Sequence, residues 1–157
     1  YLLAYSMGAR LGLAAWVNRD DLFRGGALVG VHPGLTTEAE RAARADLDRD
    51  RAARLRRLGP RAFFREWDAN PLFRGRDTRS LTWRADHEDG LARCFEVLSL
   101  ARQPALGDAL SQRVADGRAW VVVGDRDEKF RRLLAPWSPR ILPGPHDLLT
   151  ENPTALA

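Results

Sequence analysis

The chain has 157 residues, of which 45% are hydrophobic and 29% are charged. This composition is typical of one globular domain and excludes a collagen, a coiled-coil rod and a largely disordered chain. Its apolar runs are too short to cross a bilayer and no secretory signal is visible, so we expect no membrane partner. The net charge is +4, and all but one of the 25 basic residues are arginines. Because acidic and basic residues are interspersed along the chain, we expect a small anionic substrate and no nucleic acid.

The single cysteine, Cys94, cannot form an internal disulfide, which favours a reducing compartment and hence a cytoplasmic location. We expect it to be a small buried residue on a helix. Acidic residues 46–50 resemble a calcium loop but lack its glycine and its closing glutamate. Residues 86–89 contain one histidine without a second set of ligands. The sequence therefore predicts neither a metal site nor an organic cofactor.

The first part of the chain predicts a strand, a helix and a strand. Residues 1–5 are apolar and indicate a strand, and residues 7–17 carry apolar side chains at helical spacing. Residues 27–31 form an apolar run between Gly25-Gly26 and His32-Pro33-Gly34, which is typical of a buried strand.

The middle of the chain is predicted to be helical. Thr37 and Glu40 have the spacing of a capping box, and the helix that follows should end at Gly59-Pro60. Further helices are predicted over residues 61–67, 90–100 and 105–114, with an irregular polar segment over residues 74–88. We interpret residues 36–115 as a helical lid inserted into the domain.

In the last part of the chain, predicted strands alternate with predicted helices again. It predicts, in order, a strand over residues 118–123, a helix over 130–134, a strand over 140–142 and a final helix opening at Glu151-Asn152-Pro153. Strands that alternate with helices form a parallel sheet with helices on its faces. The expected fold class is therefore α/β, with residues 1–157 forming one partial domain that carries the helical insertion.

A serine lies between the first predicted strand and the first helix, in the run Ala4-Tyr5-Ser6-Met7-Gly8. This is the nucleophile-elbow pattern G-x-S-x-G with alanine in its first small position. We expect small residues two before and two after the serine because larger ones would clash at a sharp turn. The turn should expose the Ser6 hydroxyl at the start of a helix, with the Met7 N–H directed at an oxyanion beside it.

An acid and a histidine follow the last two predicted strands. Asp127 comes shortly after residues 118–123, and His146 comes after residues 140–142 in a loop held by Pro143-Gly144-Pro145. The order Ser, Asp, His is that of an α/β-hydrolase triad. Asp125 is a competing candidate for the acid, and we prefer Asp127 because it lies further beyond the strand end.

Several runs along the whole chain resemble one family, the menaquinone-pathway 2-succinyl-6-hydroxy-2,4-cyclohexadiene-1-carboxylate synthases, which are lyases with an α/β-hydrolase fold. The most specific are a His-Pro-Gly-Leu turn and a Gly-acid-Arg-Asp-x-Lys-Phe run. The matching segments are Tyr5-Ser6-Met7-Gly8-Ala9-Arg10, His32-Pro33-Gly34-Leu35, Glu40-Arg41-Ala42-Ala43-Arg44, Trp67 with Asn70-Pro71-Leu72-Phe73, Gln103-Pro104, Gly124-Asp125-Arg126-Asp127-Glu128-Lys129-Phe130, and His146 ahead of Glu151-Asn152-Pro153.

The resemblance implies a reaction in which the triad acts as a base and pyruvate is expelled from a substrate with several carboxylates. Ser6 would take the proton, His146 would activate Ser6, and Asp127 would orient His146. Arginines suit such a substrate because they bind carboxylates in a bidentate fork. The resemblance places the following residues against the substrate: Tyr5, Arg10, Arg44, Trp67 and Arg84.

The chain departs from the family at Ala4, Ala9 and Asp68, and the earlier strands of the fold, with the loop that gives the second oxyanion N–H, are absent from it. We therefore expect the C-terminal part of an α/β-hydrolase fold, inactive and poorly soluble by itself. Two other functions stay open: an esterase or thioesterase that acylates Ser6, favoured by an apolar pocket, and an inactive fragment.

Overall fold

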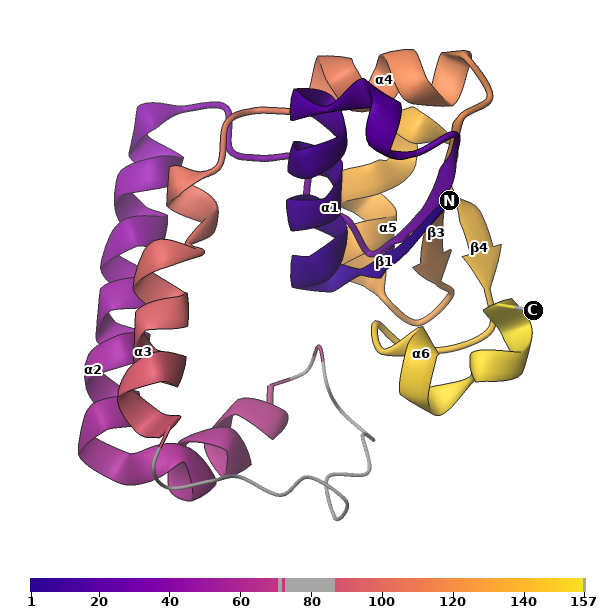
Figure 1. The fold of residues 1–157 in the computed structure, drawn as a ribbon. Helices are drawn as coiled ribbons and strands as arrows, with labels where there is room; N and C mark the ends of the chain where they lie inside the picture. The colour runs from indigo at the N-terminus through magenta and orange to yellow at the C-terminus, as the bar shows by residue number, and fades with distance from the viewer. Residues whose placement is uncertain (71, 73–86, 157) are drawn as a thin grey trace. The chain divides into compact units, whose positions relative to one another are not determined.

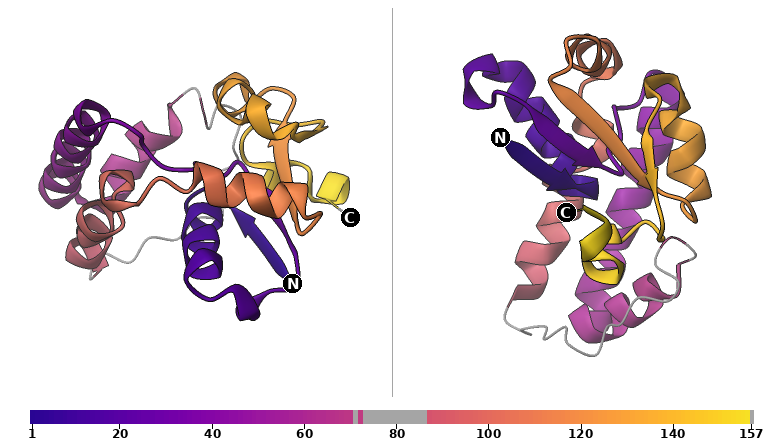
Figure 2. Two further views of the ribbon diagram at one scale, coloured as in Figure 1. Left: turned by 90° about the horizontal axis from the view of Figure 1, so that it is seen from above. Right: turned by 90° about the vertical axis from the view of Figure 1, so that its right-hand side faces the viewer.

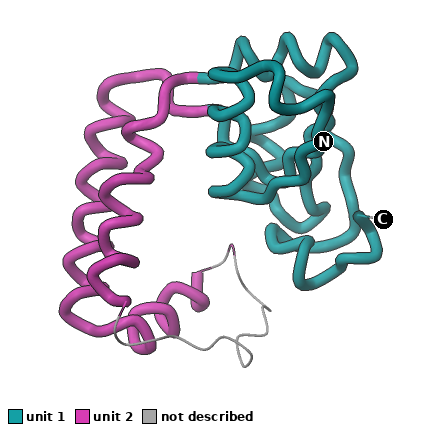
Figure 3. The backbone as a smooth tube through the Cα atoms, viewed as in Figure 1, with its two compact units in different colours: residues 1–33, 106–157 teal, residues 34–105 magenta. Residues whose placement is uncertain are grey.

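The computed structural model describes residues 1–70, 72 and 87–156. The chain divides into two compact units (Figure 3): unit 1 comprises residues 1–33 and 106–157, and unit 2 comprises residues 34–105. The predicted segment 74–88 and the candidate Arg84 lie largely or wholly outside the described residues.

Unit 1 is built on a four-stranded parallel sheet, which confirms the predicted fold class. Its strands are β1 (Leu2–Tyr5), β2 (Gly26–Val29), β3 (Ala119–Gly124) and β4 (Arg140–Leu142), paired in that order and seen side by side in Figure 2. The second strand ends two residues earlier than predicted because Gly30 has a φ of +57°, outside the strand region.

Helices of unit 1 pack on the sheet through apolar side chains. α1 (Ser6–Asn18) packs against β1 and β2, while α4 (Gly107–Ala115) and α5 (Glu128–Leu134) pack against β3 (Figure 1). Short 3₁₀ turns η1 (Asp20–Leu22) and η5 (Ala135–Trp137) follow α1 and α5. Strands and helices therefore alternate along unit 1, as the apolar pattern predicted.

One apolar cluster of unit 1 lies at the carboxyl ends of the strands. Val29, Val122 and Leu142 pack there with Leu148 of α6 (Leu148–Glu151), and the 3₁₀ turn η6 (Pro153–Leu156) adds Ala155 and Leu156. The predicted last helix therefore differs from the structure: a helical turn ends at Glu151, and a 3₁₀ turn starts at Pro153. Asn152 between them has an extended φ of −151°, which ends the first turn.

Arginines stabilise unit 1 around one tryptophan. The guanidinium groups of Arg113 and Arg118 lie 5.2 and 5.5 Å from the ring of buried Trp16, and both groups bind the Asp20 carboxylate, at 2.9 and 2.7 Å. Hydrogen bonding from Arg118 lowers the pKa of Asp20 below its ordinary value. Part of the arginine excess therefore serves packing and not substrate binding.

Unit 2 is a helical hairpin made of α2 (Glu38–Asp68) and α3 (Glu88–Val97), followed by the 3₁₀ turn η4 (Leu100–Arg102). The capping box is confirmed, since Thr37 Oγ1 accepts the Glu40 N–H and the Glu40 carboxylate accepts the Thr37 N–H. The predicted break is also confirmed as a kink inside α2, where Gly59 has a φ of +74°.

The two helices of unit 2 are joined by apolar and ionic contacts. Ala52, Leu55 and Phe63 of α2 pack with Ala92 of α3. Arg56 binds the carboxylates of Asp89 and Glu96, and its hydrogen bond lowers the pKa of Glu96 below its ordinary value.

Two expectations differ from the structure. The compact helical unit ends at Ala105 and not at residue 115, because α4 packs on β3 within unit 1. Cys94 lies on α3 as expected, but it is exposed, because α3 uses Ala92 and Phe95 for its contacts with α2. None of the helices in the described part of the chain is long and apolar enough to span a membrane.

An apolar part of the sheet stays uncovered. Leu3, Ala27 and Trp120 are neighbours across β1, β2 and β3, and Leu3 and Trp120 are 62% and 60% exposed. Parallel sheets are normally covered on both faces, and β1 is an edge strand of the sheet that the described residues form.

We predict that residues 1–157 self-associate through this uncovered surface, because exposed apolar patches and strand edges drive association. Trp120→Lys should lower the apparent mass at high protein concentration in size-exclusion chromatography with light scattering. Leu47→Lys is the matched control, since Leu47 is an exposed apolar residue of unit 2. A monomer at all concentrations would contradict the prediction.

Candidate active site

Ser6 lies on a sharp turn between β1 and α1. Tyr5 is extended, with φ −125° and ψ 137°, whereas Ser6 has a φ of +50°, a left-handed conformation that is uncommon outside glycine and is often found at functional sites. The Met7 N–H is one of the first N–H groups of α1, which have no carbonyl partner inside the helix. Both features are those of a nucleophile elbow.

The predicted steric crowding around the serine is found at a different glycine. A Cβ placed on Gly8 would meet no described atom within 4 Å beyond its chain neighbours and the adjacent backbone of α1, so the expected crowding is not found among the described residues. The close approach lies one turn further along α1, where a Cβ on Gly12 would come 3.1 Å from a methyl group of Leu2 and 3.6 Å from Ala4 Cβ. Gly12 therefore allows the helix to pack closely on β1.

The three residues of the predicted triad are brought together. His146 Nε2 lies 2.9 Å from Ser6 Oγ, and His146 Nδ1 lies 2.5 Å from Asp127 Oδ2. The side chains of His146 and Asp127 are each 1% exposed. Asp127 Oδ1 also accepts the N–H of Phe130 at 3.1 Å, as the N-cap of α5. The acid is therefore held by a hydrogen bond at each oxygen.

The loops that carry the acid and the histidine contact each other through their backbones. A Cβ on Gly124, at the end of β3, would lie 2.2 Å from the carbonyl oxygen of Pro145 and 2.3 Å from that of Gly144. The Asp125 carboxylate accepts the Gly144 N–H at 2.9 Å. Asp125, the competing candidate, thus supports the histidine loop while Asp127 contacts the imidazole.

The imidazole of His146 is fixed from several sides. The Phe130 and Tyr5 rings lie 4.6 and 5.2 Å from it, centroid to centroid, and a Cβ on Gly30 would come 2.7 Å from its Cε1 atom. Asn152 holds the loop from behind by donating to the carbonyl of Pro143 at 2.8 Å. A single orientation of the ring satisfies all these contacts.

This arrangement defines the direction of proton transfer. A carboxylate at Nδ1 accepts the N–H there, so the neutral imidazole presents its lone pair at Nε2 to the serine hydroxyl. His146 can therefore act as a general base toward Ser6, and the resulting imidazolium is stabilised by Asp127.

Of the other candidate residues, Arg10 lies in unit 1, and Arg44 and Trp67 lie in unit 2. Arg10 lies on α1 one turn after Ser6 and is 7% exposed. Arg44 and Trp67 lie on α2 in unit 2, where the Trp67 ring packs with Phe63 and Phe95. The Arg44 side chain binds the buried Asp48 carboxylate at 2.8 Å. Both residues have structural contacts within unit 2.

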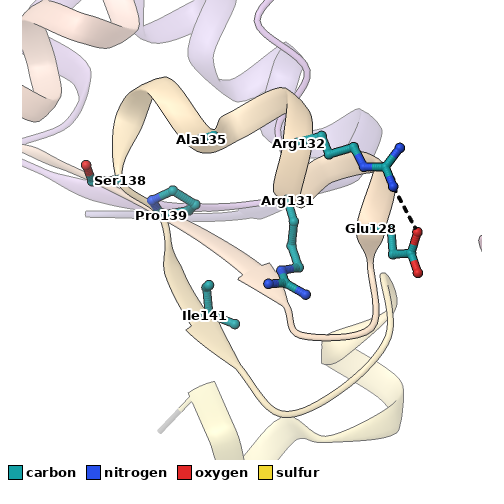
Figure 4. Close-up of a pocket in the computed structure, with 7 residues that line it drawn as sticks. All are labelled: Glu128, Arg131, Arg132, Ala135, Ser138, Pro139 and Ile141. Atoms are coloured by element: carbon teal, nitrogen blue, oxygen red, sulfur yellow. Dashed lines mark hydrogen bonds and ion pairs between the residues drawn. The ribbon is translucent and has the colours of Figure 1, made fainter.

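A surface hollow of unit 1 lies between α5 and β4 (Figure 4). Its lining residues are Glu128, Arg131, Arg132, Ala135, Ser138, Pro139 and Ile141. The two arginines are engaged, Arg131 with the carbonyl of Asp125 and Arg132 with Glu128. None of the triad residues lines this hollow.

Sequence reasoning did not identify Gly30, Phe130 and Asn152 as parts of the site. Gly30 lay inside the predicted strand over residues 27–31, and a glycine near the carboxyl end of a predicted strand was the available signal. Phe130 and Asn152 lay inside the runs that carried the family resemblance. No local pattern indicated which atoms these side chains would contact.

No protein-family model matches the chain. The chain is 35% identical over 164 residues to a 2-succinyl-6-hydroxy-2,4-cyclohexadiene-1-carboxylate synthase of Citrobacter koseri and 32% identical to a synthase of the same name from Escherichia coli O1:K1. Each alignment covers 99% of this chain and 64% of the relative. The chain thus spans less than two thirds of the length of these curated relatives, and the resemblance stated from the motifs is confirmed.

Solved structures confirm the fold. The structure of MenH from S. aureus superposes with a TM-score of 0.78 at 21% identity, covering 99% of this chain and 64% of that one. A carboxylesterase structure from the thaumarchaeon Nitrososphaera gargenis superposes with a TM-score of 0.59 at 18% identity, over 98% and 60% of the two chains. Unit 1 with its insertion is therefore part of an α/β-hydrolase fold.

We predict that Gly30→Ala displaces the His146 ring and strongly lowers the rate of any reaction in which Ser6 and His146 take part. The matched control is Gly117→Ala, because Gly117 has a similar φ of +68° with no described atom within 4 Å of its added Cβ. Both variants should lose about 1–2 kcal/mol of stability from the left-handed backbone. Only Gly30→Ala should lose activity beyond what this instability explains. Equal activity of the two variants at a temperature where both are folded would contradict the prediction.

Proposed function

We propose that the protein is a lyase of menaquinone biosynthesis. It removes pyruvate from 2-succinyl-5-enolpyruvyl-6-hydroxy-3-cyclohexene-1-carboxylate and gives 2-succinyl-6-hydroxy-2,4-cyclohexadiene-1-carboxylate. The observation that carries this proposal is the hydrogen-bonded series Ser6, His146 and Asp127 on a nucleophile elbow, in a chain similar to the synthases named above.

The triad acts as a base in this reaction. His146 Nε2 takes the hydroxyl proton of Ser6 as Ser6 Oγ takes a proton from a ring carbon of the substrate. The electron pair of the C2–H bond forms the C2=C3 double bond, the C3=C4 electron pair moves to C4=C5, and the C5–O bond to the enolpyruvyl group breaks. The leaving oxygen keeps its electron pair and becomes the enol of pyruvate after protonation, and no acyl-serine forms. Asp127 holds the imidazole in the tautomer that this transfer needs.

Charge complementarity supports the substrate class. The substrate carries several carboxylates, and we propose that Arg10 and Arg44 bind them, with Arg84 as a further contact. From the resemblance we also propose that Tyr5 and Trp67 contact the substrate, and that the Met7 N–H stabilises negative charge that develops on the substrate beside Ser6.

The second candidate function is that of an esterase or thioesterase. The 2.9 Å contact between Ser6 Oγ and His146 Nε2 also suits attack on an ester, followed by an acyl-serine. The two functions differ in their need for arginine, since an ester with an apolar acyl group gains nothing from a guanidinium.

We predict that Arg10→Ala lowers kcat/KM for pyruvate release by about 10²-fold, as expected when one bidentate contact to a carboxylate is lost. Pyruvate is followed with a coupled dehydrogenase, in the protein with any sequence that flanks this chain. A burst of acylated Ser6 with an activated ester, together with an unchanged Arg10→Ala variant, would support the esterase instead.

Asp127→Asn should lower kcat by about 10⁴-fold without unfolding the protein, because an amide favours the wrong imidazole tautomer. Asp125→Asn is the matched control, since its amide oxygen can still accept the Gly144 N–H and it does not contact His146. The measurement is the rate of pyruvate release at saturating substrate. A larger loss in Asp125→Asn would overturn the assignment of the acid.

A further inference from the structure

A carboxylate is buried in the middle of unit 2. Asp48 of α2 is 1% exposed, and a buried carboxylate needs hydrogen bonds and opposite charge to remain ionised. Its Oδ2 accepts from Arg44 Nε at 2.8 Å and from Ser99 Oγ at 2.7 Å, and its Oδ1 accepts from Arg51 Nη1 at 2.8 Å. Two guanidinium groups therefore share one carboxylate.

The spacing of these residues follows the helix. Arg44, Asp48 and Arg51 are separated by four and three positions, so they lie on one face of α2. The Arg51 guanidinium also lies 4.9 Å from the centre of the Trp67 ring. Asp48 and Arg51 thus connect Arg44 with Trp67, the two residues of α2 that the proposed function places against the substrate.

Arg44 is held at one end of its guanidinium. Its Nε binds Asp48, and within the described part of the chain it makes no other hydrogen bond, so its two Nη groups are available. The side chain is 29% exposed. Two parallel N–H donors of this kind bind a carboxylate in the bidentate fashion.

The charges of the cluster favour an anion. Two guanidinium groups and one carboxylate leave one unbalanced positive charge on this face of α2. A buried ion pair adds little net stability compared with apolar residues of the same size, so stability alone does not explain a carboxylate at this position. Its geometric effect is to restrict the guanidinium of Arg44.

We propose that Asp48 is a positioning residue that acts through Arg44. It holds the guanidinium plane by the Nε bond so that the Nη pair receives a carboxylate of the substrate. This inference rests on the proposed function, and it adds a residue to the site that makes no substrate contact itself. Ser99 and Arg51 complete the hydrogen bonds of Asp48 and keep its carboxylate in place.

The test is the kinetics of pyruvate release by Asp48→Asn, measured on the protein with any flanking sequence. We expect KM to rise about tenfold with kcat within about twofold of its original value, the pattern of a lost binding contact. Asp46→Asn is the matched control, because Asp46 lies on the same helix, is exposed and pairs only with Arg49. It should leave KM unchanged.

A double-mutant cycle separates positioning from a structural effect. In an Arg44→Ala background, Asp48→Asn should raise KM no further, because the guanidinium that Asp48 positions is gone. An equal rise of KM in both backgrounds, or a lower melting temperature with an unchanged KM, would overturn the proposal.

Arg44→Lys keeps the proposal testable if Asp48→Asn does not fold. A lysine has the charge but no second pair of N–H donors beside an Nε group, so KM should rise about as much as in Arg44→Ala. A KM equal to that of the unmodified protein would show that orientation of a guanidinium is not needed, and would overturn the role of Asp48.

Ser6→Ala distinguishes failure of this inference from failure of the proposed function. If Ser6→Ala abolishes pyruvate release and the Asp48 variants leave KM unchanged, only the positioning role is overturned. If the protein releases no pyruvate from the substrate at all, the proposed function is overturned and the inference about Asp48 with it.

Discussion

The position of the His146 imidazole is the constraint on which the site depends. A ring that must reach Ser6 Oγ with one nitrogen and Asp127 with the other has one usable orientation. That orientation favours glycine at position 30, where an added Cβ would come 2.7 Å from the Cε1 atom of the ring. It also requires glycine at position 124, where the loops of the acid and the histidine touch. The two glycines therefore fix the position of the imidazole although neither forms a hydrogen bond to it.

The arginines of this chain have two kinds of partner. Arg113 and Arg118 lie over Trp16 and share Asp20, and they hold α4 and β3 to the end of α1. Arg44 shares Asp48 with Arg51, and its Nη groups make no hydrogen bond to another described residue. The same residue type thus serves packing where both ends of the guanidinium are engaged, and leaves donors open where only the Nε end is engaged. Composition alone does not separate these cases.

Much of the fold followed from local patterns because the physical causes are local. The capping box at Thr37 and the break at Gly59 depend on backbone groups within a few residues, and the strands are short apolar runs between turn residues. The exceptions depended on distant partners. The helix α4 belongs with β3 and not with the helical unit because of contacts across the sheet, and Cys94 is exposed because α3 turns other side chains toward α2.

The sequence by itself indicated Ser6, His146 and one of two neighbouring aspartates as triad candidates, since residues that follow successive parallel strands gather at the same edge of the sheet. It also determined the family that the chain resembles, because that depends on residue identities. Only the tertiary structure decided that Asp127 and not Asp125 faces the imidazole, that Gly12 and not Gly8 is crowded, and that Asp48 binds Arg44. These outcomes are distances between side chains and backbone atoms in space, and spacing along the chain does not specify them.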